Sequence, residues 1–483
     1  MKFMRTHFGK VLFAAALAGL WAGCSFAPKY SRPTVETPAS FKENSGANNT
    51  DTNIWQLAQP NDAVIRSNWW EMFNDPVLNS LEEQVAISNQ NVVAALENYL
   101  SAHAIVREDQ AQYYPLATAG PSVTKSRQFS SGFSQASPYH TIYDIPFDAS
   151  WEPDLWGKIY NTVKSAKGTA QADAADLENA KLSAQAELAS DYFQLQGQDA
   201  LEKLFDDTVN AYSNSLKLTQ VLFKTGIDSD QDVAQAQTQL DTTEAQATNL
   251  RILRAQLEHA IAVLMGRAPG DFSIPRSPLI ARPPNIPVAL PSQLLERRPD
   301  IAAQERAVFS ANAEIGVARS AFFPNISLTA SGGFESLAKD NLFDWSSRVY
   351  SIGAAASQPL FNAALPPGLA QYNAQYRGAV ASYRQTVLSA FQGVEDNLVA
   401  LRVYKTQIAQ QEVAVNSSQN YLNLALYRYK LGIDSYLNVI TAQTTLLSNS
   451  QTLVNLYTQQ MMDAVLLVED LGGGWDASQL PKD

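Results

Sequence analysis

The chain of 483 residues contains a single cysteine, Cys24, and only four histidines. Without a second thiol it can form neither an internal disulfide nor a thiolate metal site. The histidines beyond the first 24 residues, His103, His140 and His259, are scattered and lack the spacing of metal ligands. The sequence also lacks a nucleophile elbow and a phosphate-binding loop. We therefore expect no catalytic site, no metal and no cofactor.

Long hydrophobic runs and a basic surface are also missing. No segment after residue 24 contains 18 consecutive apolar residues, so the sequence predicts no transmembrane helix, and any membrane-spanning part would have to be a β-barrel. The formal net charge is −12, and removing Lys2, Arg5 and Lys10 with a signal peptide would make it −15. Because nucleic acid requires a basic face, we expect no nucleic-acid partner.

The N-terminus reads as an export signal that covers residues 1–23. Three basic residues flank a short apolar core at 11–20, which is too short to span a bilayer. Ala22, Gly23 and Cys24 then resemble a bacterial lipobox, although Trp21 stands where leucine is usual. An ordinary signal peptide cleaved nearby is the alternative. We expect Cys24 to be the lipidated first residue of the mature chain.

The chain contains an internal repeat of about 200 residues. Residues 224–240 recur at 430–446 with ten of seventeen positions identical, and residues 91–115 align with 300–324. The period is too long for a solenoid, so we expect two similar halves of one architecture. We divide the mature chain into an extended leader (24–68), a first repeat (69–285), a second repeat (286–475) and a tail (476–483).

Each repeat contains a predicted pair of strands. From 139 to 152 apolar and aromatic residues alternate with polar ones, which places the two sets on opposite faces of a sheet. Residues 324–334 repeat the pattern, and 116–128 and 348–361 are weaker candidates. Four strands cannot close a membrane barrel, since the smallest have about eight. If these strands cross a membrane, several copies of the chain must therefore complete the barrel.

Helices make up most of the chain. Pro76 opens a predicted helix that runs to about residue 112, and 158–223 and 367–430 predict helices of roughly 95–100 Å. Each long helix meets a return helix at the repeated turn. Gly226 and Gly432 suit a left-handed helix end there. Asp228 or Ser229, and Asp434 or Ser435, are the candidate caps of the return helices, and we favour the caps over ligands for both aspartates.

Several short motifs follow one another in a distinctive order. They are residues 27–33, Trp69-Trp70 with Phe73, Asp75 and Pro76, 151–157, 294–301, 315–324 and 472–475. In this order they resemble the outer membrane factor (TolC-like) family, and specifically the lipoprotein branch that serves as exit duct of tripartite efflux pumps. The resemblance implies a mainly α fold with mixed α and β parts: a homotrimer whose protomers contribute four strands each to a 12-stranded outer-membrane β-barrel, continued by a long periplasmic α-helical barrel. It also implies a periplasmic adaptor, an inner-membrane transporter and outer-membrane lipid as partners.

The resemblance implies a periplasmic gate near the second repeated turn. Leu437 matches an apolar gate residue, and Tyr429 and Asp232 match residues that link helices in the closed state. The acidic residues that ring the pore in relatives appear here as Asn438 and Thr441, and a linking arginine appears as Asp434. An ordinary coiled-coil core is the alternative for Leu437 and Tyr429. We also expect the two turns to dock the adaptor, through Lys224, Gly226 and Asp228 in the first and Lys430, Gly432 and Asp434 in the second.

The leading function is a passive outer-membrane channel for small molecules that an inner-membrane transporter and an adaptor deliver. A type I protein-secretion duct shares the fold, but the lipobox favours small-molecule efflux. A periplasmic coiled-coil adaptor lipoprotein is a third possibility, which the two helical hairpins and the aromatic strands disfavour. The expected location is the outer membrane, lipid-anchored, with a long periplasmic extension.

Overall fold

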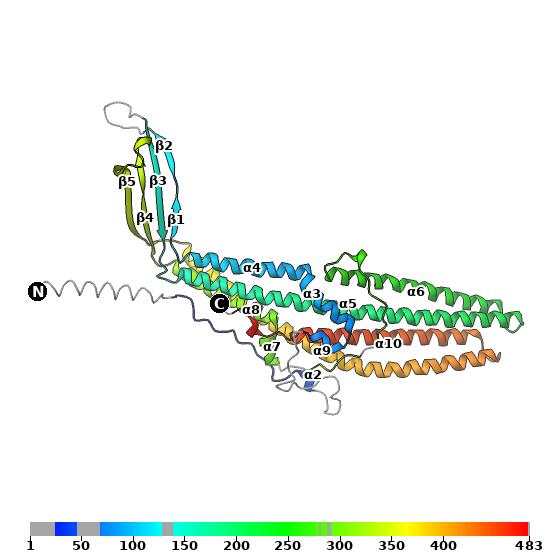
Figure 1. The fold of residues 1–483 in the computed structure, drawn as a ribbon. Helices are drawn as coiled ribbons and strands as arrows, with labels where there is room; N and C mark the ends of the chain where they lie inside the picture. Colours follow the sequence, from blue (N-terminus) through cyan, green and yellow to red (C-terminus); the bar gives the residue numbers. More distant parts are fainter. Residues whose placement is uncertain (1–24, 46–67, 128–138, 280–281, 287–290, 482–483) are drawn as a thin grey trace.

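The computed structural model describes residues 25–45, 68–127, 139–279, 282–286 and 291–481. An antiparallel sheet stands at one end of the molecule, and two long helical hairpins extend from it to the other end (Figure 1). The predicted signal peptide and Cys24 lie outside the described residues. The chain is mainly helical, as expected.

Six of the described helices form three pairs of matching length, with one member of each pair in each half of the chain. The short helix α4 and its counterpart α8 both have 22 residues, the long helices α5 and α9 have 67 and 66, and the return helices α6 and α10 both have 35. Among the described helices, none is both long enough and apolar enough to cross a membrane. The helix bounds are α2 (Lys42–Ser45), α3 (Pro76–Ser88), α4 (Gln90–Ala111), α5 (Lys158–Lys224), α6 (Asp230–Leu264), α7 (Pro291–Arg297), α8 (Pro299–Ser320), α9 (Leu365–Lys430) and α10 (Tyr436–Asp470).

The helix predicted from Pro76 to about residue 112 is two helices, because Asn89 interrupts it. Asn89 has extended backbone angles, and its side chain caps α4 by accepting from the amides of Asn91 (2.9 Å) and Val92 (3.3 Å). The same side chain donates to the carbonyl of Leu264 at the end of α6 (3.0 Å). A local cap and a distant helix end therefore fix the break together, and only the first could be read from sequence.

The sheet contains β1 (Leu116–Ala119), β2 (Ser122–Ser126), β3 (His140–Trp151), β4 (Asn325–Ser336) and β5 (Arg348–Ser357). β1 and β2 both pair with β3, which pairs with β4, which pairs with β5. The strand predicted over 116–128 is thus split. The split lies at Gly120 and Pro121, opposite Pro146 of β3, where two prolines supply no amide donor to the ladder.

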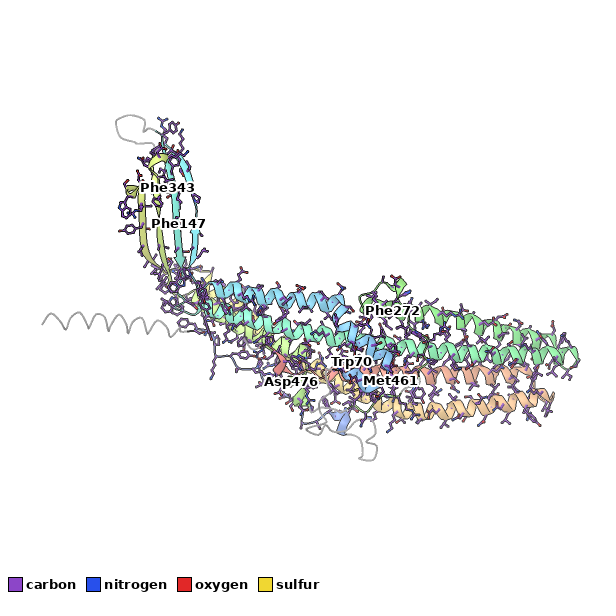
Figure 2. The ribbon with its side chains drawn as sticks, viewed as in Figure 1. Trp70, Phe147, Phe272, Phe343, Met461 and Asp476 are labelled. Carbon is purple, nitrogen blue, oxygen red and sulfur yellow. The ribbon has the colours of Figure 1, made fainter. Side chains whose placement is uncertain are left out.

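The register sorts the strands into an apolar and a polar face. On one face Ile145 lies opposite Phe334, and Phe147 lies opposite Gly332, which in turn pairs with Tyr350. On the other face Asp144 lies opposite Glu335, and Asp148 opposite Ser331. Residues directly opposite each other in an antiparallel pair share a face. The alternation predicted from single strands therefore extends across the sheet, and Figure 2 shows Phe147 on it.

The main hydrophobic core lies where the halves of the chain meet, far from the sheet. It joins Trp69 and Leu78, which lie before and within α3, to Leu188 of α5, Val394 of α9 and Met461 of α10, all less than 2 % exposed. Figure 2 labels Trp70 and Met461 in this region. This core holds the two hairpins together at their bases.

The described leader begins at the base of the sheet and runs along the helices. The ring of Phe26 stacks on Phe323 with centroids 4.3 Å apart, and Ser25 Oγ donates to Asn161 Oδ1 at 3.1 Å. Farther along, Arg32 donates to the carbonyl of Leu295 (2.7 Å) and Glu43 forms an ion pair with Arg402 of α9. The leader is therefore extended, as expected, but is held by specific contacts.

Candidate functional site: the hairpin tips

Both repeated turns end a long helix in the same way. Gly226 and Gly432 have φ values of +77° and +67°, in the region where residues with a Cβ are strained. The amides of Ile227 and Ile433 donate to Leu222 and Arg428 of the preceding helices, at 2.9 and 3.0 Å. This is the Schellman arrangement, and it confirms the predicted role of the glycines. Lys224 and Lys430 are the last residues of α5 and α9.

Of the two candidate caps in each turn, the serine occupies the N-cap position and the aspartate, which we favoured as a cap over a ligand, does not. Ser229 is the N-cap of α6 and forms a capping box with Asp232, and Ser435 occupies the N-cap position of α10 without a side-chain cap bond. Asp228 and Asp434 are engaged elsewhere. In each turn the serine one position later has the extended backbone that a cap requires. Asp228 bonds instead across the tip to the second hairpin, and Asp434 bonds within its own turn.

Asp228 joins the two hairpins through Tyr429. The Tyr429 hydroxyl donates to Asp228 Oδ2 and also lies 2.9 Å from Thr219 Oγ1 of α5. The tyrosine ring is 1 % exposed and lies 5.2 Å from the ring of Tyr436. Burial, followed by the bond to Asp228, raises the pKa of Tyr429, so the phenol keeps its proton at neutral pH. The structure thus pairs Tyr429 with Asp228, while Asp232 is held in its capping box.

Asp434 closes the second turn on itself. Arg428 Nε donates to Asp434 Oδ2 at 2.6 Å, across six residues. This hydrogen bond is the main reason why the pKa of Asp434 is lowered. Sequence reasoning missed Arg428. An arginine and an aspartate that flank a turn glycine are the signal that could have found the pair.

The candidate gate residues form an exposed stripe at the start of α10. Leu437 is 59 % exposed, and Asn438 and Thr441 are exposed beside it. Tyr436 and Val439 point the other way and are almost completely buried. They belong to a hydrophobic cluster at the ends of the two hairpins, here named the tip cluster, which also contains Tyr212 and Tyr429. The helical spacing therefore separates core positions from the stripe. The coiled-coil core interpretation fits Tyr429 within this protomer but not Leu437.

The tips lie side by side at the end of the molecule farthest from the sheet (Figure 1). A Cβ added to Gly432 would lie 3.9 Å from Ile227 of the other turn. Apolar side chains are exposed around both turns, among them Ile227 (61 %) and Ile433 (59 %). The two tips differ in charge. The first tip carries Asp228, Asp230 and Asp232 against Lys224, whereas the second carries Arg428 and Lys430 against Asp434.

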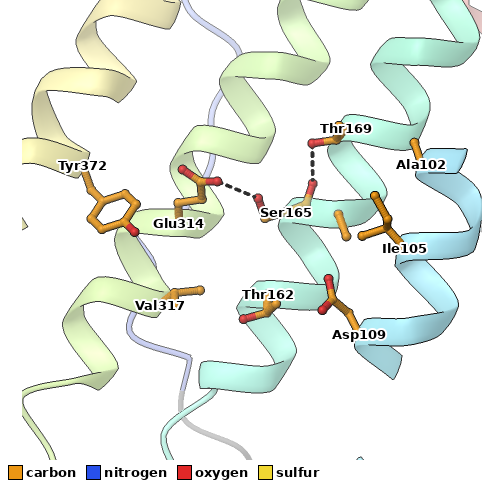
Figure 3. Close-up of a pocket in the computed structure, with 10 residues that line it drawn as sticks. Ala102, Ile105, Asp109, Thr162, Ser165, Thr169, Glu314, Val317 and Tyr372 are labelled. Carbon is orange, nitrogen blue, oxygen red and sulfur yellow. Dashed lines mark hydrogen bonds between the residues drawn. The ribbon is translucent and has the colours of Figure 1, made fainter. Parts of the chain in front are cut away.

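A cavity of about 280 Å³ lies at the other end of the helices, between α4, α5, α8 and α9 (Figure 3). Ser165, Thr169 and Glu314 line it, and Ser165 Oγ donates to Glu314 Oε1 at 3.4 Å. Asp109 lies on its far side, where burial raises the pKa of this carboxyl. The carboxylates are not clustered. Within the described ranges, no three His, Cys, Asp or Glu side chains are grouped to hold a metal ion.

The fold, with its small sheet and paired helical hairpins, is that of outer-membrane efflux channels. The family profile described as "Outer membrane efflux protein" matches residues 81–267 and 290–473. The chain belongs to this family, whose members are channels and not enzymes.

Individual relatives agree in length and in structure. The chain is 31% identical over 470 residues to a "Probable efflux pump outer membrane protein TtgC" of Pseudomonas putida, covering 96% of each chain. It is 31% identical over 475 residues to the "Outer membrane protein OprJ" of Pseudomonas aeruginosa, again covering 96% of each. The solved outer-membrane channel OprN superposes with a TM-score of 0.85 at 27% identity, over 94% of this chain and 100% of that one. CusC superposes with a TM-score of 0.83 at 25% identity, over 93% and 100%.

Proposed function

We propose that this chain is the outer-membrane channel of a tripartite efflux pump, a passive exit duct for small molecules. An inner-membrane transporter and a periplasmic adaptor deliver the substrate, and the sheet end lies in the outer membrane. The observation that carries the proposal is the pairing of a sheet that has one apolar and one polar face with two long hairpins that share a tip. The relatives named as efflux-pump outer membrane proteins support it.

The described sheet has four strand positions, because β1 and β2 occupy one between them. A trimer would supply twelve, which exceeds the minimum of about eight for a closed barrel. We propose a homotrimer with a 12-stranded barrel, continued by a periplasmic helical barrel of two repeats per protomer. The paired helix lengths and the two matched family segments support the repeats at 69–285 and 286–475.

The orientation of the sheet can be tested by placing a charge on each face. Phe147, on the apolar face, would meet lipid, and Asp148, on the polar face, would meet the lumen. A lysine facing lipid near the bilayer midplane costs about 2–4 kcal/mol. We therefore expect Phe147→Lys to reduce the amount of trimer in outer-membrane fractions far more than the matched control Asp148→Lys. Equal amounts of the two variants would contradict the face assignment.

Cys24 is proposed as the lipid anchor. It lies outside the described residues, but its neighbour Ser25 contacts Asn161 at the base of the sheet, beside the stacked rings of Phe26 and Phe323. An acyl chain on residue 24 would thus begin where the sheet leaves the membrane. Mass spectrometry of the mature N-terminus should find acylation at Cys24. An unmodified terminus at another residue would refute the anchor.

The hairpin tips are proposed as the adaptor-docking end and the resting gate. Exposed apolar side chains around Gly226 and Gly432 offer a contact surface. The gate is proposed just inside it, at Leu437, Asn438 and Thr441, and their exposure at the start of α10 supports this role. Gly432→Val would force a β-branched residue into the left-handed region, at a cost of about 1–2 kcal/mol or more, although its surroundings are open. We expect this variant to lose adaptor crosslinking and efflux while the trimer remains in the membrane.

Leu437→Ala tests the gate separately. It removes an exposed apolar group and leaves the tip cluster intact, so basal conductance in a planar bilayer should rise with unchanged assembly. Unchanged conductance would remove Leu437 from the gate but leave the duct in place.

The two alternatives make different predictions. A type I secretion duct would export a protein substrate when it is supplied with the matching transporter, whereas an adaptor lipoprotein would not conduct by itself. Drug-susceptibility complementation, together with single-channel conductance of the purified trimer, separates the three. Conductance without drug export would favour the secretion duct, and absence of both would favour the adaptor.

A further inference from the structure

A groove of about 620 Å³ lies at the junction between the sheet and the helices, far from the tips and on another side of α5 from the cavity of Figure 3. It spans the C-terminal end of α4, the first turns of α5 and the middle of α8. Three cationic side chains, Lys164, Lys167 and Arg306, line it together with Tyr113, Tyr160 and Phe309. This combination of cations, phenols and an aromatic face suits a phosphate group attached to an apolar tail.

Lys164 and Lys167 bring two positive charges to the groove. Among the described residues, no carboxylate forms an ion pair with Lys164 or Lys167, which face the same side three residues apart on α5. Lys164 Nζ instead lies 5.0 Å from the centroid of the Phe309 ring. Arg306 is partly neutralised, because its Nε donates to Glu305 at 2.5 Å. A bound anion would relieve the repulsion between the lysines.

The groove lies on the face of the helix layer that carries the leader. Tyr30 of the leader packs edge-on against Phe309, with centroids 5.1 Å apart, and its hydroxyl bonds to Glu305. On α5 the groove residues Lys164 and Lys167 alternate with Ser165 and Thr169, which line the cavity of Figure 3 on another side of the helix. The leader and the groove thus share one surface.

The position of the groove along the molecule matches a membrane interface. Tyr113 and Tyr114 lie between the end of α4 at Ala111 and the start of β1 at Leu116, and Tyr114 is 74 % exposed. The Trp151 indole at the end of β3 donates to the carbonyl of Tyr113 at 3.0 Å. Tyrosine and tryptophan are enriched at the level of lipid headgroups.

We propose that this groove binds the headgroup of an anionic phospholipid from the periplasmic leaflet of the outer membrane. Lys164 and Lys167 contact the phosphate, Tyr160 and Arg306 border it, and the acyl chains follow the apolar face of the sheet. The inference rests on the membrane placement of the sheet proposed above. It adds a second lipid contact beside Cys24 on the same surface.

Native mass spectrometry of the detergent-solubilised trimer with phosphatidylglycerol or phosphatidylcholine tests the site. We expect retention of phosphatidylglycerol in preference to phosphatidylcholine. The double variant Lys164→Gln and Lys167→Gln should reduce the bound phosphatidylglycerol about tenfold, the effect of losing about 1.4 kcal/mol. The matched control Lys203→Gln and Lys217→Gln removes the same charge from exposed positions farther along α5 and should bind as the wild type does.

Three results would overturn the proposal. Equal retention of the two lipids by the wild-type trimer would show that the groove does not recognise the headgroup charge, and this result does not depend on any variant folding. Equal loss in the two double variants would show a general charge effect. Complete displacement of the lipid by excess inorganic phosphate would indicate a free-anion site. Outer-membrane fractionation and conductance of the wild type, measured in parallel, separate failure of this site from failure of the proposed function.

Discussion

At the scale of single residues, Glu82 is an acidic side chain in an apolar environment. It is 0 % exposed on α3, and neither of its carboxylate oxygens has a hydrogen-bond partner in the described part of the chain. Burial raises the pKa of Glu82 well above its ordinary value, and no neighbouring charge contributes to the shift. This shift favours the neutral form of the carboxyl in the folded state, within the core that joins the two hairpins at their bases.

This placement predicts a stability that falls as pH rises. Below the ordinary pKa of 4.5 the carboxyl is protonated in both states; above it, only the folded state keeps the proton, so unfolding is favoured increasingly until the raised pKa is reached. Glu82→Leu should stabilise the protein by about 1–3 kcal/mol at neutral pH and abolish this fall. Thermal melting at mildly acidic and mildly alkaline pH measures both effects.

Glu82→Gln and Glu83→Gln are the matched controls. The glutamine substitution at position 82 would keep a buried polar group that does not titrate, so it should remove the pH dependence with less stabilisation. Glu83 is the exposed neighbour on α3, and its replacement should change neither quantity. A Glu82→Leu protein with the wild-type pH dependence would show that Glu82 is ionised in the folded state.

At the scale of helices and strands, patterns within one element predicted structure well. The long helices begin and end within two residues of their predicted limits, and the turn glycines have the predicted conformation. Strand alternation gave the apolar face of β3. These features depend on periodicity and backbone sterics, which are determined by residues close together in the sequence.

Contacts between distant elements could not be read in this way. The bond from Tyr429 to Asp228 joins positions 201 residues apart, and Asn89 reaches Leu264 across 175. The resemblance implied inter-helix links through Tyr429 and Asp232. In the structure Asp232 is hydrogen-bonded to Ser229 in the capping box, and Tyr429 bonds to Asp228 instead. Side chains that have two possible partners are resolved only by the packed structure.

The link between the hairpins yields a prediction about the closed channel. Tyr429→Phe and Asp228→Ala should each weaken the tip cluster by about 1 kcal/mol, and together by little more, because each removes the hydrogen bond from the Tyr429 hydroxyl to Asp228. Each should also raise basal conductance. A double-mutant cycle on trimer melting, combined with planar-bilayer recordings, measures the coupling. Asp232→Asn is the comparison: it loses a helix cap without breaking the link, so conductance should stay at the wild-type level.

At the scale of the whole molecule, the two hairpins share length and turn geometry but differ in charge. The segment from Tyr436 to residue 462 of α10 contains no charged residue. The equivalent helix α6 carries Asp230, Asp232, Asp241, Glu244, Arg251, Arg254 and Glu258. The exposed stripe of α10 presents Asn438, Thr441, Thr444 and Thr445 instead. In the proposed trimer, three copies of this stripe would surround the constriction with neutral hydroxyl and amide groups.

A neutral constriction should attract cations weakly and resist block by divalent ions, since rings of carboxylates are what concentrate cations in a pore. Asn438→Asp combined with Thr441→Asp would add six carboxylates per trimer at the ring. We expect this variant to become more cation-selective and to be blocked by divalent cations that leave the wild type open. Reversal potentials in a salt gradient and titration with a divalent salt measure the two effects.

The matched control, Gln231→Asp with Thr238→Asp, adds the same charge to exposed positions of the first hairpin. It should leave the cation selectivity and the divalent block unchanged. Block of the wild-type channel at the concentration that blocks the ring variant would show that the stripe of α10 does not line the constriction.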